Sequence, residues 1–202
     1  MHVDVCFRLH GEQLPLDHGY ALYGAISRRL PEAHEQNDWG IHPVYGARTR
    51  PGVLALNDKS MLKIRMRGDE INDVLGLAGK QLDVDGDQLK VGVPEVHPLE
   101  PAEALKSRYV TIKGYMERDE FQGAVGRQLE ELLDTEDELP GVKVGERRVM
   151  EIDGYTIVGF RVGLEGLSRE ESMTLQTRGI GGRRKMGAGI FRPGTFEGDT
   201  DE

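Results

Sequence analysis

Near its end the chain contains the sequence Gly179-Ile180-Gly181-Gly182-Arg183-Arg184-Lys185-Met186-Gly187-Ala188-Gly189-Ile190-Phe191, which joins a predicted helix to a predicted strand. Five of these residues are glycines and three consecutive ones are cations. Glycine reaches backbone conformations that are closed to other residues and lets a ligand approach the main chain closely. Exposed N–H groups beside arginine and lysine side chains suit an anion, so we predict that this glycine-rich loop binds phosphate.

The charge around the glycine-rich loop supports an anion as its ligand. From Arg178 to Arg192 the chain carries five basic residues and no acidic one. The alternative interpretation is a solvated connection whose charges only keep the chain soluble. The loop matches neither the P-loop pattern nor the dinucleotide fingerprint, because that fingerprint follows a strand and opens a helix.

The composition is typical of a soluble globular protein that is not a general nucleic-acid binder. The 202 residues include 35 acidic and 26 basic ones, so the net charge is −9, whereas a general binder is basic. One focused basic surface is still compatible with this charge. Cys6 is the only cysteine, so no disulfide forms within the chain, which fits a reducing cytoplasm. No apolar run approaches the roughly 18 residues of a membrane span, and we expect a cytoplasmic protein without a membrane partner.

Alternating and helical patterns predict the order strand–helix–strand–strand–helix–strand in the first half of the chain. The predicted strands are His2–Leu9, Gly52–Leu56, Ser60–Arg67 and a hairpin over Leu82–Val93, and the predicted helices are one that Asp17 caps and that runs to Leu30, and Asp69–Leu77. Gly11–Leu16 is predicted as a loop and Asn37–Gly46 as irregular. Val96–Ala104, with two prolines, is predicted as a linker between domains.

The second half repeats this order. Its predicted strands are Ser107–Gly114, Gly145–Ile152, Tyr155–Leu164 and Gly189–Arg192, and its predicted helices are Asp119–Leu133 and a second that runs from a capping box at Ser168 to Arg178. We therefore predict an α+β protein of two tandem ferredoxin-like (RRM-like, βαββαβ) units with a C-terminal glycine-rich loop. The predicted domains span 1–95 and 105–193. We expect an acidic loop over Thr135–Gly141 and a disordered acidic tail over 194–202.

Several motifs in combination resemble one family. The segments that carry the resemblance are Leu14-Pro15-Leu16-Asp17-His18-Gly19-Tyr20-Ala21-Leu22-Tyr23, Gly40-Ile41-His42, Leu77-Ala78-Gly79-Lys80, Val110-Thr111-Ile112-Lys113-Gly114 and Gly181 to Phe191. They are similar to the CRISPR-associated repeat-processing endoribonucleases of the RAMP superfamily, in the branch of myxobacterial-type I systems. The resemblance covers nearly the whole chain, to about Pro193, and leaves the acidic tail outside.

The resemblance implies a reaction and its partners. That family cleaves the repeat within precursor CRISPR RNA without a metal ion. The 2′-OH beside the scissile phosphate attacks, which leaves a 2′,3′-cyclic phosphate and a 5′-OH, and many members then stay on the 3′ hairpin of the product in the interference complex. The expected partners are therefore CRISPR repeat RNA, the crRNA 3′ hairpin and other effector-complex subunits, and no cofactor is expected. The alternative is a non-catalytic crRNA-binding subunit of the same fold. An unrelated RNA-recognition module is less favoured, because the strands lack its aromatic pattern.

Histidines are the candidate acid and base, because an unperturbed imidazole titrates near neutral pH. His34 follows the first helix, where catalytic histidines of the family commonly lie, and it is the first candidate among six histidines. His42 is the second candidate. The alternative for each is a surface or capping histidine.

Family members also use a tyrosine of the first helix and a nearby lysine, and this sequence departs from that pattern. Ungapped matching places Ser27 at the tyrosine position, and the candidate Tyr23 lies one turn earlier. No lysine occurs between Arg8 and Lys59, so Arg48 or Arg50 would supply the charge. The alternative for Tyr23 is packing against the sheet.

RNA contacts are predicted from charge. The predicted contact residues are Arg178, Arg183, Arg184, Lys185, Arg192, Arg48 and Arg50. Lys63, Arg65 and Arg67 share one strand face, which either contacts phosphates or is simply solvated. No metal site is predicted, because the histidines and carboxylates between His34 and His42 match no standard ligand spacing. Phosphate contacts predict an affinity that falls steeply with salt.

Overall fold

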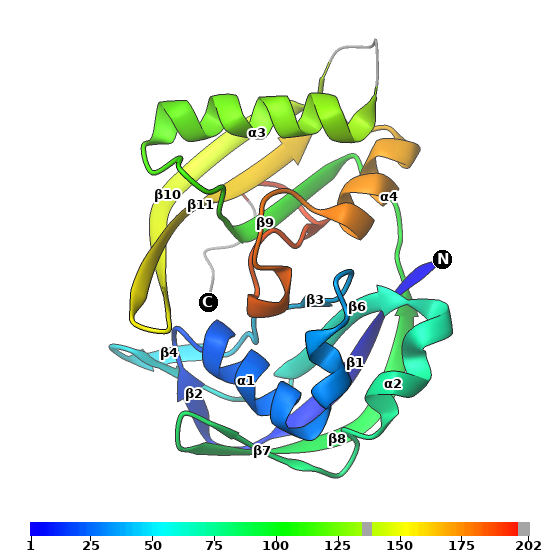
Figure 1. Cartoon of the computed structure of the whole chain (residues 1–202), viewed down its shortest axis with the longest axis vertical. Helices are drawn as coiled ribbons and strands as arrows, with labels where there is room; N and C mark the ends of the chain where they lie inside the picture. Colours follow the sequence, from blue (N-terminus) through cyan, green and yellow to red (C-terminus); the bar gives the residue numbers. More distant parts are fainter. Residues whose placement is uncertain (135–138, 198–202) are drawn as a thin grey trace. The chain divides into compact units, whose positions relative to one another are not determined.

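The structure, a computed structural model, describes residues 1–134 and 139–197. Its contacts divide the chain into two compact units, Met1–Pro98 and one that begins at Leu99. Each unit contains an antiparallel sheet with two helices on one of its faces (Figure 1). The protein is therefore α+β with two ferredoxin-like units, as the sequence predicts. Across the described residues, no helix is long and apolar enough to cross a membrane.

The first unit is built on a five-stranded sheet. Its elements are β1 (His2–His10), β2 (Gln13–Pro15), α1 (Gly19–Arg29), η1 (Pro31–His34), β3 (Gly40–Ile41), β4 (Ala47–Arg50), β5 (Val53–Ala55), β6 (Met61–Arg67), η2 (Gly68–Glu70), α2 (Ile71–Leu75), β7 (Gln81–Val84) and β8 (Asp87–Pro98). The sheet order is β3-β6-β1-β8-β7, with β1 antiparallel to both β6 and β8. The first strand thus lies between the third and fourth strands of the ferredoxin-like order.

In the five-stranded sheet, the second strand of the ferredoxin-like order is β3. The prediction that Gly52–Leu56 forms this strand was wrong. Val53–Ala55 pairs instead with β2 and β4 in a separate three-stranded sheet, and β2 lies where a loop was predicted. β3 pairs with β6 through Gly40 and Ile41 alone. Two residues are too few to show the alternation by which a strand is recognised.

Three local predictions in the first unit also need correction. β1 is not half-buried, because Asp4 and Cys6 on its polar face are buried as well. The N-cap of α1 is His18 and not Asp17. The buried His18 ring lies 2.9 Å from the Pro15 carbonyl through Nδ1 and accepts from the Val44 amide at 2.9 Å through Nε2. Strand β8 continues to Pro98, opposite Val3, so Val96 belongs to a strand and not to a linker.

The second unit is a four-stranded sheet covered by two helices. Its elements are β9 (Ala104–Val110), α3 (Arg118–Leu133), β10 (Gly141–Ile152), β11 (Tyr155–Glu165), α4 (Arg169–Arg178), η3 (Arg184–Met186) and β12 (Arg192–Pro193). The order β10-β11-β9-β12 is the ferredoxin-like order. The apolar stripe of α3, with Phe121 and Val125, packs on Phe160 and Val162 of β11.

In the second unit, local sequence signals predicted most of the helices, strands and turns. The capping box is present: Ser168 Oγ accepts from the Glu171 amide, and the Glu171 carboxylate accepts from the Ser168 amide at 2.7 Å. Asp153 and Gly154 turn the β10–β11 hairpin with φ of 51° and 78°, as Asp85 and Gly86 turn β7–β8. β9 ends at Val110 and β12 begins at Arg192, so the predictions of Ser107–Gly114 and Gly189–Arg192 extend too far. Parts of the predicted acidic loop and tail, 135–138 and 198–202, lie outside the described residues.

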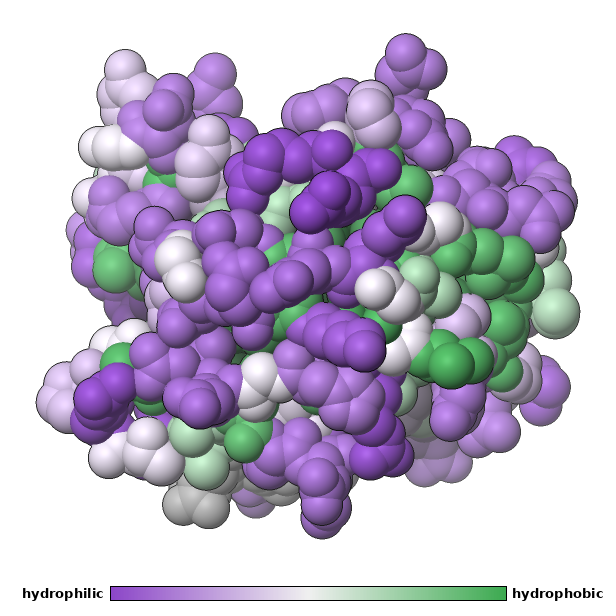
Figure 2. All heavy atoms as spheres, turned by 90° about the horizontal axis from the view of Figure 1, so that it is seen from below, coloured by the Kyte–Doolittle hydropathy of each residue, from purple (hydrophilic) through white to green (hydrophobic). Residues whose placement is uncertain are grey.

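The surface seen in Figure 2 is mainly polar, as expected from the high content of charged residues. Figure 2 shows a mainly hydrophilic face, with hydrophobic side chains gathered along one side. Of the described large apolar residues, Val93 on β8 and Tyr155 at the β10–β11 turn are among the most exposed. Polar residues cover most of the view, which suits the charged content of 30%.

Candidate functional site

Two of the predicted catalytic residues, Tyr23 and His34, meet in the first unit. The Tyr23 hydroxyl lies 2.9 Å from His34 Nδ1, and the two rings pack edge to face with their centroids 5.5 Å apart. Tyr23 is only 8% exposed, whereas His34 is exposed. Helix α1 ends at Arg29, and Pro31 starts the turn η1 that brings His34 back to the helix. The pair therefore joins a buried anchor to an accessible imidazole.

The Tyr23 hydroxyl can hold His34 in either protonation pattern. When the O–H donates to a bare Nδ1, Nε2 carries the proton and can give it away. When the hydroxyl accepts from Nδ1–H, Nε2 carries the lone pair and can take a proton. Either tautomer is held in orientation by the buried tyrosine, which is the role of a partner in acid–base catalysis.

Ser27, at the tyrosine position by ungapped matching, does not take part in this pair. Its side chain is buried one turn further along α1, and its Oγ has no hydrogen-bond partner among the described residues. The residue that faces His34 is Tyr23.

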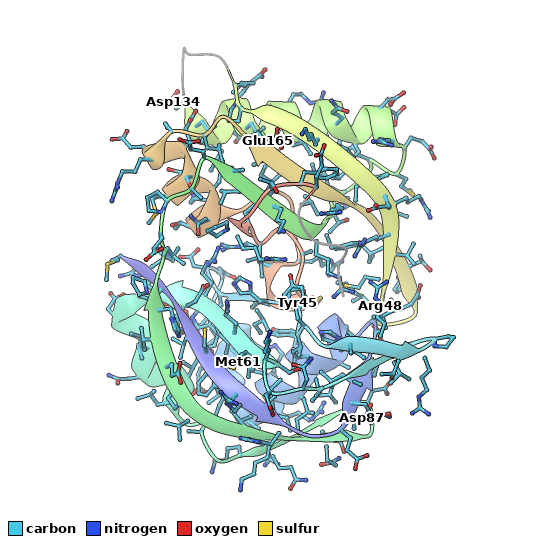
Figure 3. The ribbon with its side chains drawn as sticks, turned by 180° about the vertical axis from the view of Figure 1, so that it is seen from behind. Tyr45, Arg48, Met61, Asp87, Asp134 and Glu165 are labelled. Carbon is cyan, nitrogen blue, oxygen red and sulfur yellow. The ribbon has the colours of Figure 1, made fainter. Side chains whose placement is uncertain are left out.

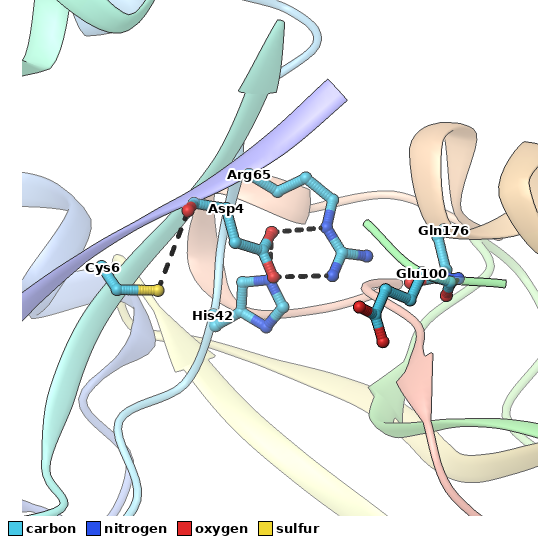
Figure 4. Close-up of polar contacts among 6 residues, drawn as sticks. All are labelled: Asp4, Cys6, His42, Arg65, Glu100 and Gln176. Atoms are coloured by element: carbon cyan, nitrogen blue, oxygen red, sulfur yellow. Dashed lines mark hydrogen bonds and ion pairs between the residues drawn. The ribbon is translucent and has the colours of Figure 1, made fainter. Parts of the chain in front are cut away.

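His42 is held in different surroundings, beside a buried ion pair (Figure 4). Arg65 Nε and Nη2 donate to the two oxygens of the Asp4 carboxylate at 2.7 and 3.0 Å. His42 Nε2 lies 3.6 Å from the same carboxylate. Arg65 is 1% exposed, so it is neither a solvated residue nor available to phosphate on this strand face.

The electrostatics of this cluster favour a structural role for His42. Burial lowers the pKa of His42 to about 4, and the nearby Asp4 carboxylate offsets this only in part. Burial alone would raise the pKa of Asp4, but its contacts with His42 and Arg65 outweigh burial and hold that pKa well below its usual range. At neutral pH the cluster is an Asp4–Arg65 ion pair beside a neutral, buried imidazole. The catalytic role of His42 stays a prediction, and the accessible His34 is the stronger candidate.

The predicted cations Arg48 and Arg50 lie on β4, in the three-stranded sheet of the first unit. All four residues of β4 are exposed, and Figure 3 shows Arg48 on the strand pair that extends from the body of this unit. Arg50 Nη2 donates to Gln13 Oε1 at 2.7 Å, and Gln13 in turn donates to Asp87 at 3.1 Å. Arg50 is therefore partly committed to Gln13, while exposure suits both arginines to phosphate contacts.

The glycine-rich loop is a folded lobe of the second unit and not an open cradle. The Gly181 amide donates to Gln128 Oε1 at 2.8 Å, and the Gly182 and Gly189 amides donate to the Thr111 and Tyr109 carbonyls at 3.1 and 2.8 Å. These three amides are used within the fold, which corrects the expectation that they face a ligand. Phosphate contacts of the loop then depend on its side chains: Arg183 is exposed, and Arg184 and Lys185 are half-buried in η3.

Two glycines of the loop are required because they pack closely against backbone carbonyl groups. A Cβ at Gly181 would lie 2.3 Å from the Thr111 carbonyl oxygen, and one at Gly189 would lie 2.3 Å from the Ile180 carbonyl oxygen. Both residues have positive φ, of 76° and 67°. At Gly182 a Cβ meets no atom within 4 Å and φ is not in the left-handed region. Glycine is thus demanded at some positions of the loop and only permitted at others.

We expect Gly181→Ala and Gly189→Ala to disrupt the glycine-rich loop and Gly182→Ala to leave it intact. The left-handed conformation alone costs a non-glycine residue about 1–3 kcal/mol, and the carbonyl clash adds to this cost. Urea unfolding should report the lost stability, and RNA binding should fall in the same two variants. Equal behaviour of all three variants would contradict this account of the loop.

The other end of the second unit is acidic and unsuited to RNA. A groove of about 1030 Å³ lies between the end of α3, the start of β10 and the start of α4. Its lining has no cation among the described residues and includes the carboxylates Glu103, Asp134, Glu165, Glu170 and Glu171, of which Figure 3 labels Asp134 and Glu165. These charges repel phosphate, so RNA contacts are expected elsewhere on the unit.

The described residues contain no group of three or more histidine, cysteine, aspartate or glutamate side chains placed to hold a metal ion. Glu35 and Asp38, considered as ligands with His34 and His42, do not form such a group with them.

Solved structures of other proteins share the fold of this chain. A solved structure described as a RAMP protein binding different RNA substrates has a TM-score of 0.70 at 15% identity, covering 95% of this chain and 98% of that one. A Cas6-related protein from Pyrococcus furiosus has a TM-score of 0.68 at 15% identity, covering 98% of this chain and all of its own. At these identities the likeness concerns the fold.

Sequence comparison identifies the family. The family model for Cas6, described as Cas6 Crispr, matches residues 3–195. The CRISPR-associated endonuclease Cas6 of Myxococcus xanthus (strain DK1622) is 38% identical over 195 residues, which is 95% of this chain and 81% of that protein. The chain belongs to the Cas6 family.

Sequence reasoning missed several residues that shape these sites. Gln128 on α3 holds the Gly181 amide, and Asp4 on β1 neutralises Arg65. No local signal could find either one, because each acts on a residue far away along the chain.

Proposed function

We propose that the chain is a metal-independent endoribonuclease that cleaves CRISPR repeat RNA to mature crRNA and then stays on the repeat hairpin as a subunit of the interference complex. Membership of the Cas6 family makes it a CRISPR-associated endonuclease that processes repeat RNA. The observation that carries the finer proposal is the accessible His34 imidazole, oriented by the buried Tyr23 hydroxyl.

The chemistry needs a base, an acid and positive charge. A base removes the proton of the 2′-OH, whose oxygen attacks the adjacent phosphorus. The bond to the leaving 5′ oxygen breaks, and an acid protonates that oxygen, so that the products are a 2′,3′-cyclic phosphate and a 5′-OH. His34 serves as base or acid through Nε2, because Nδ1 is engaged by Tyr23. No step requires a metal ion.

Arginine and lysine side chains supply the positive charge. Exposed Arg183, with Arg184 and Lys185 beside it, is suited to phosphates of the repeat, and Arg178 ends α4 in the same unit. Charge-assisted hydrogen bonds stabilise the negative charge that grows on the phosphate during attack. Because these contacts are ionic, we expect repeat binding to weaken steeply as salt rises.

The decisive experiment is cleavage of a cognate repeat RNA in excess chelator. Wild type should cut, and the upstream product should resist periodate oxidation because a cyclic phosphate leaves no free diol. The downstream product should accept a 5′ label without prior phosphatase treatment. A 2′-deoxy substitution beside the scissile phosphate is the matched control and should stop cleavage.

The outcomes separate the alternatives. Cleavage that requires a divalent ion, or that proceeds with the 2′-deoxy substrate, would contradict the proposed mechanism. A wild-type chain that binds the repeat tightly and never cuts it would be a non-catalytic crRNA-binding subunit. Retention of the 3′ product on the protein in gel filtration tests the proposed place in a complex.

A further inference from the structure

The face of the second sheet that lies opposite α3 and α4 carries a row of cations. Phe160, Val162 and Leu164 of β11 point into the core, so Arg161 and Gly163 between them point to the other face. Gly163 lies directly between Lys143 of β10 and Lys106 of β9, and Lys106 is paired with Arg192 of β12. Side chains in such a row share one face of the sheet.

The C-terminal segment of the chain crosses this row. After β12 the Gly194 amide donates to the Ala104 carbonyl at 3.1 Å, and a Cβ at Gly194 would lie 2.7 Å from Lys106 Cε. The Phe196 ring then covers β11 and β10, since a Cβ at Gly163 or Gly145 would lie 2.6 or 2.9 Å from it. Because Gly163 and Gly145 have no side chains, they leave room for the flat Phe196 ring against the sheet.

In this segment an aromatic ring, Phe196, contacts Arg161, and an anion, Glu197, lies near Lys143. The Arg161 guanidinium stacks over the Phe196 ring at 4.7 Å from its centroid and also donates to the Phe196 carbonyl. Lys143 Nζ donates to the Glu165 carboxylate at 2.9 Å, and the Glu197 carboxylate lies 3.9 Å from the same ammonium group. A ring on a guanidinium beside an anion on an ammonium is the arrangement that a nucleotide makes with a protein, through its base and its phosphate.

From these contacts the geometry points to a nucleotide-binding subsite on this face, formed by Arg161, Gly163, Lys106 and Lys143, which Phe196 and Glu197 occupy until single-stranded RNA displaces them. The inference rests on the proposed RNA-processing function. Phe196 lies just beyond the residues matched by the family model, 3–195. Asp199, Asp201 and Glu202 follow in the sequence and extend the run of anions.

Another aromatic ring, that of Tyr109, also packs on a glycine of β11, and the comparison shows that the packing of Phe196 differs from ordinary core packing. A Cβ at Gly159 would lie 2.7 Å from the Tyr109 ring. The Tyr109 hydroxyl donates to the Ile157 carbonyl at 2.6 Å. That ring comes from strand β9 itself and belongs to an apolar cluster with Met150 and Ile152. Phe196 follows β12, lies in no strand and is held by Arg161, so it can leave without opening the sheet.

The test compares the RNA affinity of wild type with that of Phe196→Ala and of Phe196→Trp at one fixed salt concentration, using the cognate repeat RNA with single-stranded flanks. Because removal of a cation–π contact frees the subsite, Phe196→Ala should bind about threefold to tenfold more tightly, and Phe196→Trp more weakly than wild type. Adding Arg161→Ala to Phe196→Ala should cancel the gain. Tyr155→Ala, which removes an exposed aromatic ring from the same sheet, is the control and should change nothing.

Photo-crosslinking locates the effect. RNA carrying 5-iodouridine in its single-stranded flank should crosslink to peptides that contain residues 159–165, and more strongly in Phe196→Ala than in wild type. Unchanged or weaker RNA binding by Phe196→Ala with an unchanged melting temperature would overturn the inference, as would crosslinks that never include β11. If Phe196→Ala unfolds, Glu197→Gln gives the same test with the ring in place.

The outcomes for wild type separate this inference from the proposed function. A wild type that neither binds nor cuts repeat RNA would overturn the proposed function itself. A wild type that cuts normally while these variants show no change would overturn this inference alone.

Discussion

His34→Ala is expected to lose RNA cleavage by about 100- to 10,000-fold in single-turnover rate, the range that one positioned acid or base contributes. Binding of the repeat should be retained, because His34 is assigned to proton transfer and the loop cations to the phosphates. The measurement is single-turnover cleavage of the repeat RNA beside a filter-binding isotherm for the same RNA. His10→Ala, at an exposed histidine of β1, is the matched control and should cut normally.

Tyr23→Phe tests the partner in this pair. It removes one neutral hydrogen bond and leaves the buried ring, so we expect a loss of about fivefold, in the rate and not in RNA affinity. Tyr20→Phe, at an exposed tyrosine of the same helix, should have no effect. If His34→Ala cuts at the wild-type rate, the assignment is wrong and His42 becomes the candidate. If it fails to bind RNA, His34 is a binding residue and not a proton carrier.

Asp4→Asn is expected to cost about 3–5 kcal/mol of unfolding free energy, because it leaves the Arg65 charge buried without its counterion. Arg65 is bound by both oxygens of Asp4 and is 1% exposed. Since contacts lower the pKa of Asp4 in the folded state, its contribution is complete at neutral pH. It is lost only as the pH falls below the ordinary carboxyl value of about 4. The measurement is urea unfolding of both chains at pH 7 and along a descending pH series.

The chain supplies a matched control two residues further along the same strand. Arg67 makes a similar pair with Asp69, with 2.5 Å between Nη2 and Oδ2, but these side chains are 51% and 65% exposed. Asp69→Asn should therefore have little effect. The double variant Asp4→Leu with Arg65→Leu should recover most of the loss, because no buried charge remains. An Asp4→Asn variant as stable as Asp69→Asn would show that the pair does not hold this sheet together.

Much of the fold could be predicted because its signals are local. The hairpin turns at Asp85-Gly86 and Asp153-Gly154 and the capping box at Ser168 act within a few residues. The stripe on α3 repeats within a single helix. Such features need no knowledge of what the element packs against, so the tandem ferredoxin-like order follows from them. The brief strand β3 was missed, because two residues carry no periodic signal.

The candidate site was predicted by residue type and resemblance, and its geometry was not. The choice of Tyr23 over Ser27 depends on which turn of α1 faces the histidine, and this is set where Pro31 folds η1 back. Arg65 was grouped with Lys63 and Arg67 as one cationic face, because alternation cannot distinguish a solvated cation from a buried one. Its partner Asp4 lies 61 positions earlier in the chain.

By itself, the sequence determined most of the element types, the tandem architecture, the family and the residues able to carry acid–base chemistry, since these depend on local periodicity, turn chemistry and motif. Tertiary structure alone decided which of those residues meet: Tyr23 with His34, and Asp4 with Arg65 beside His42. It also decided that glycines of the loop pack against backbone carbonyl groups and that Phe196 rests on the sheet. The physical reason is that burial, ion pairing and steric fit are properties of neighbours in space, and those neighbours come from distant parts of the chain.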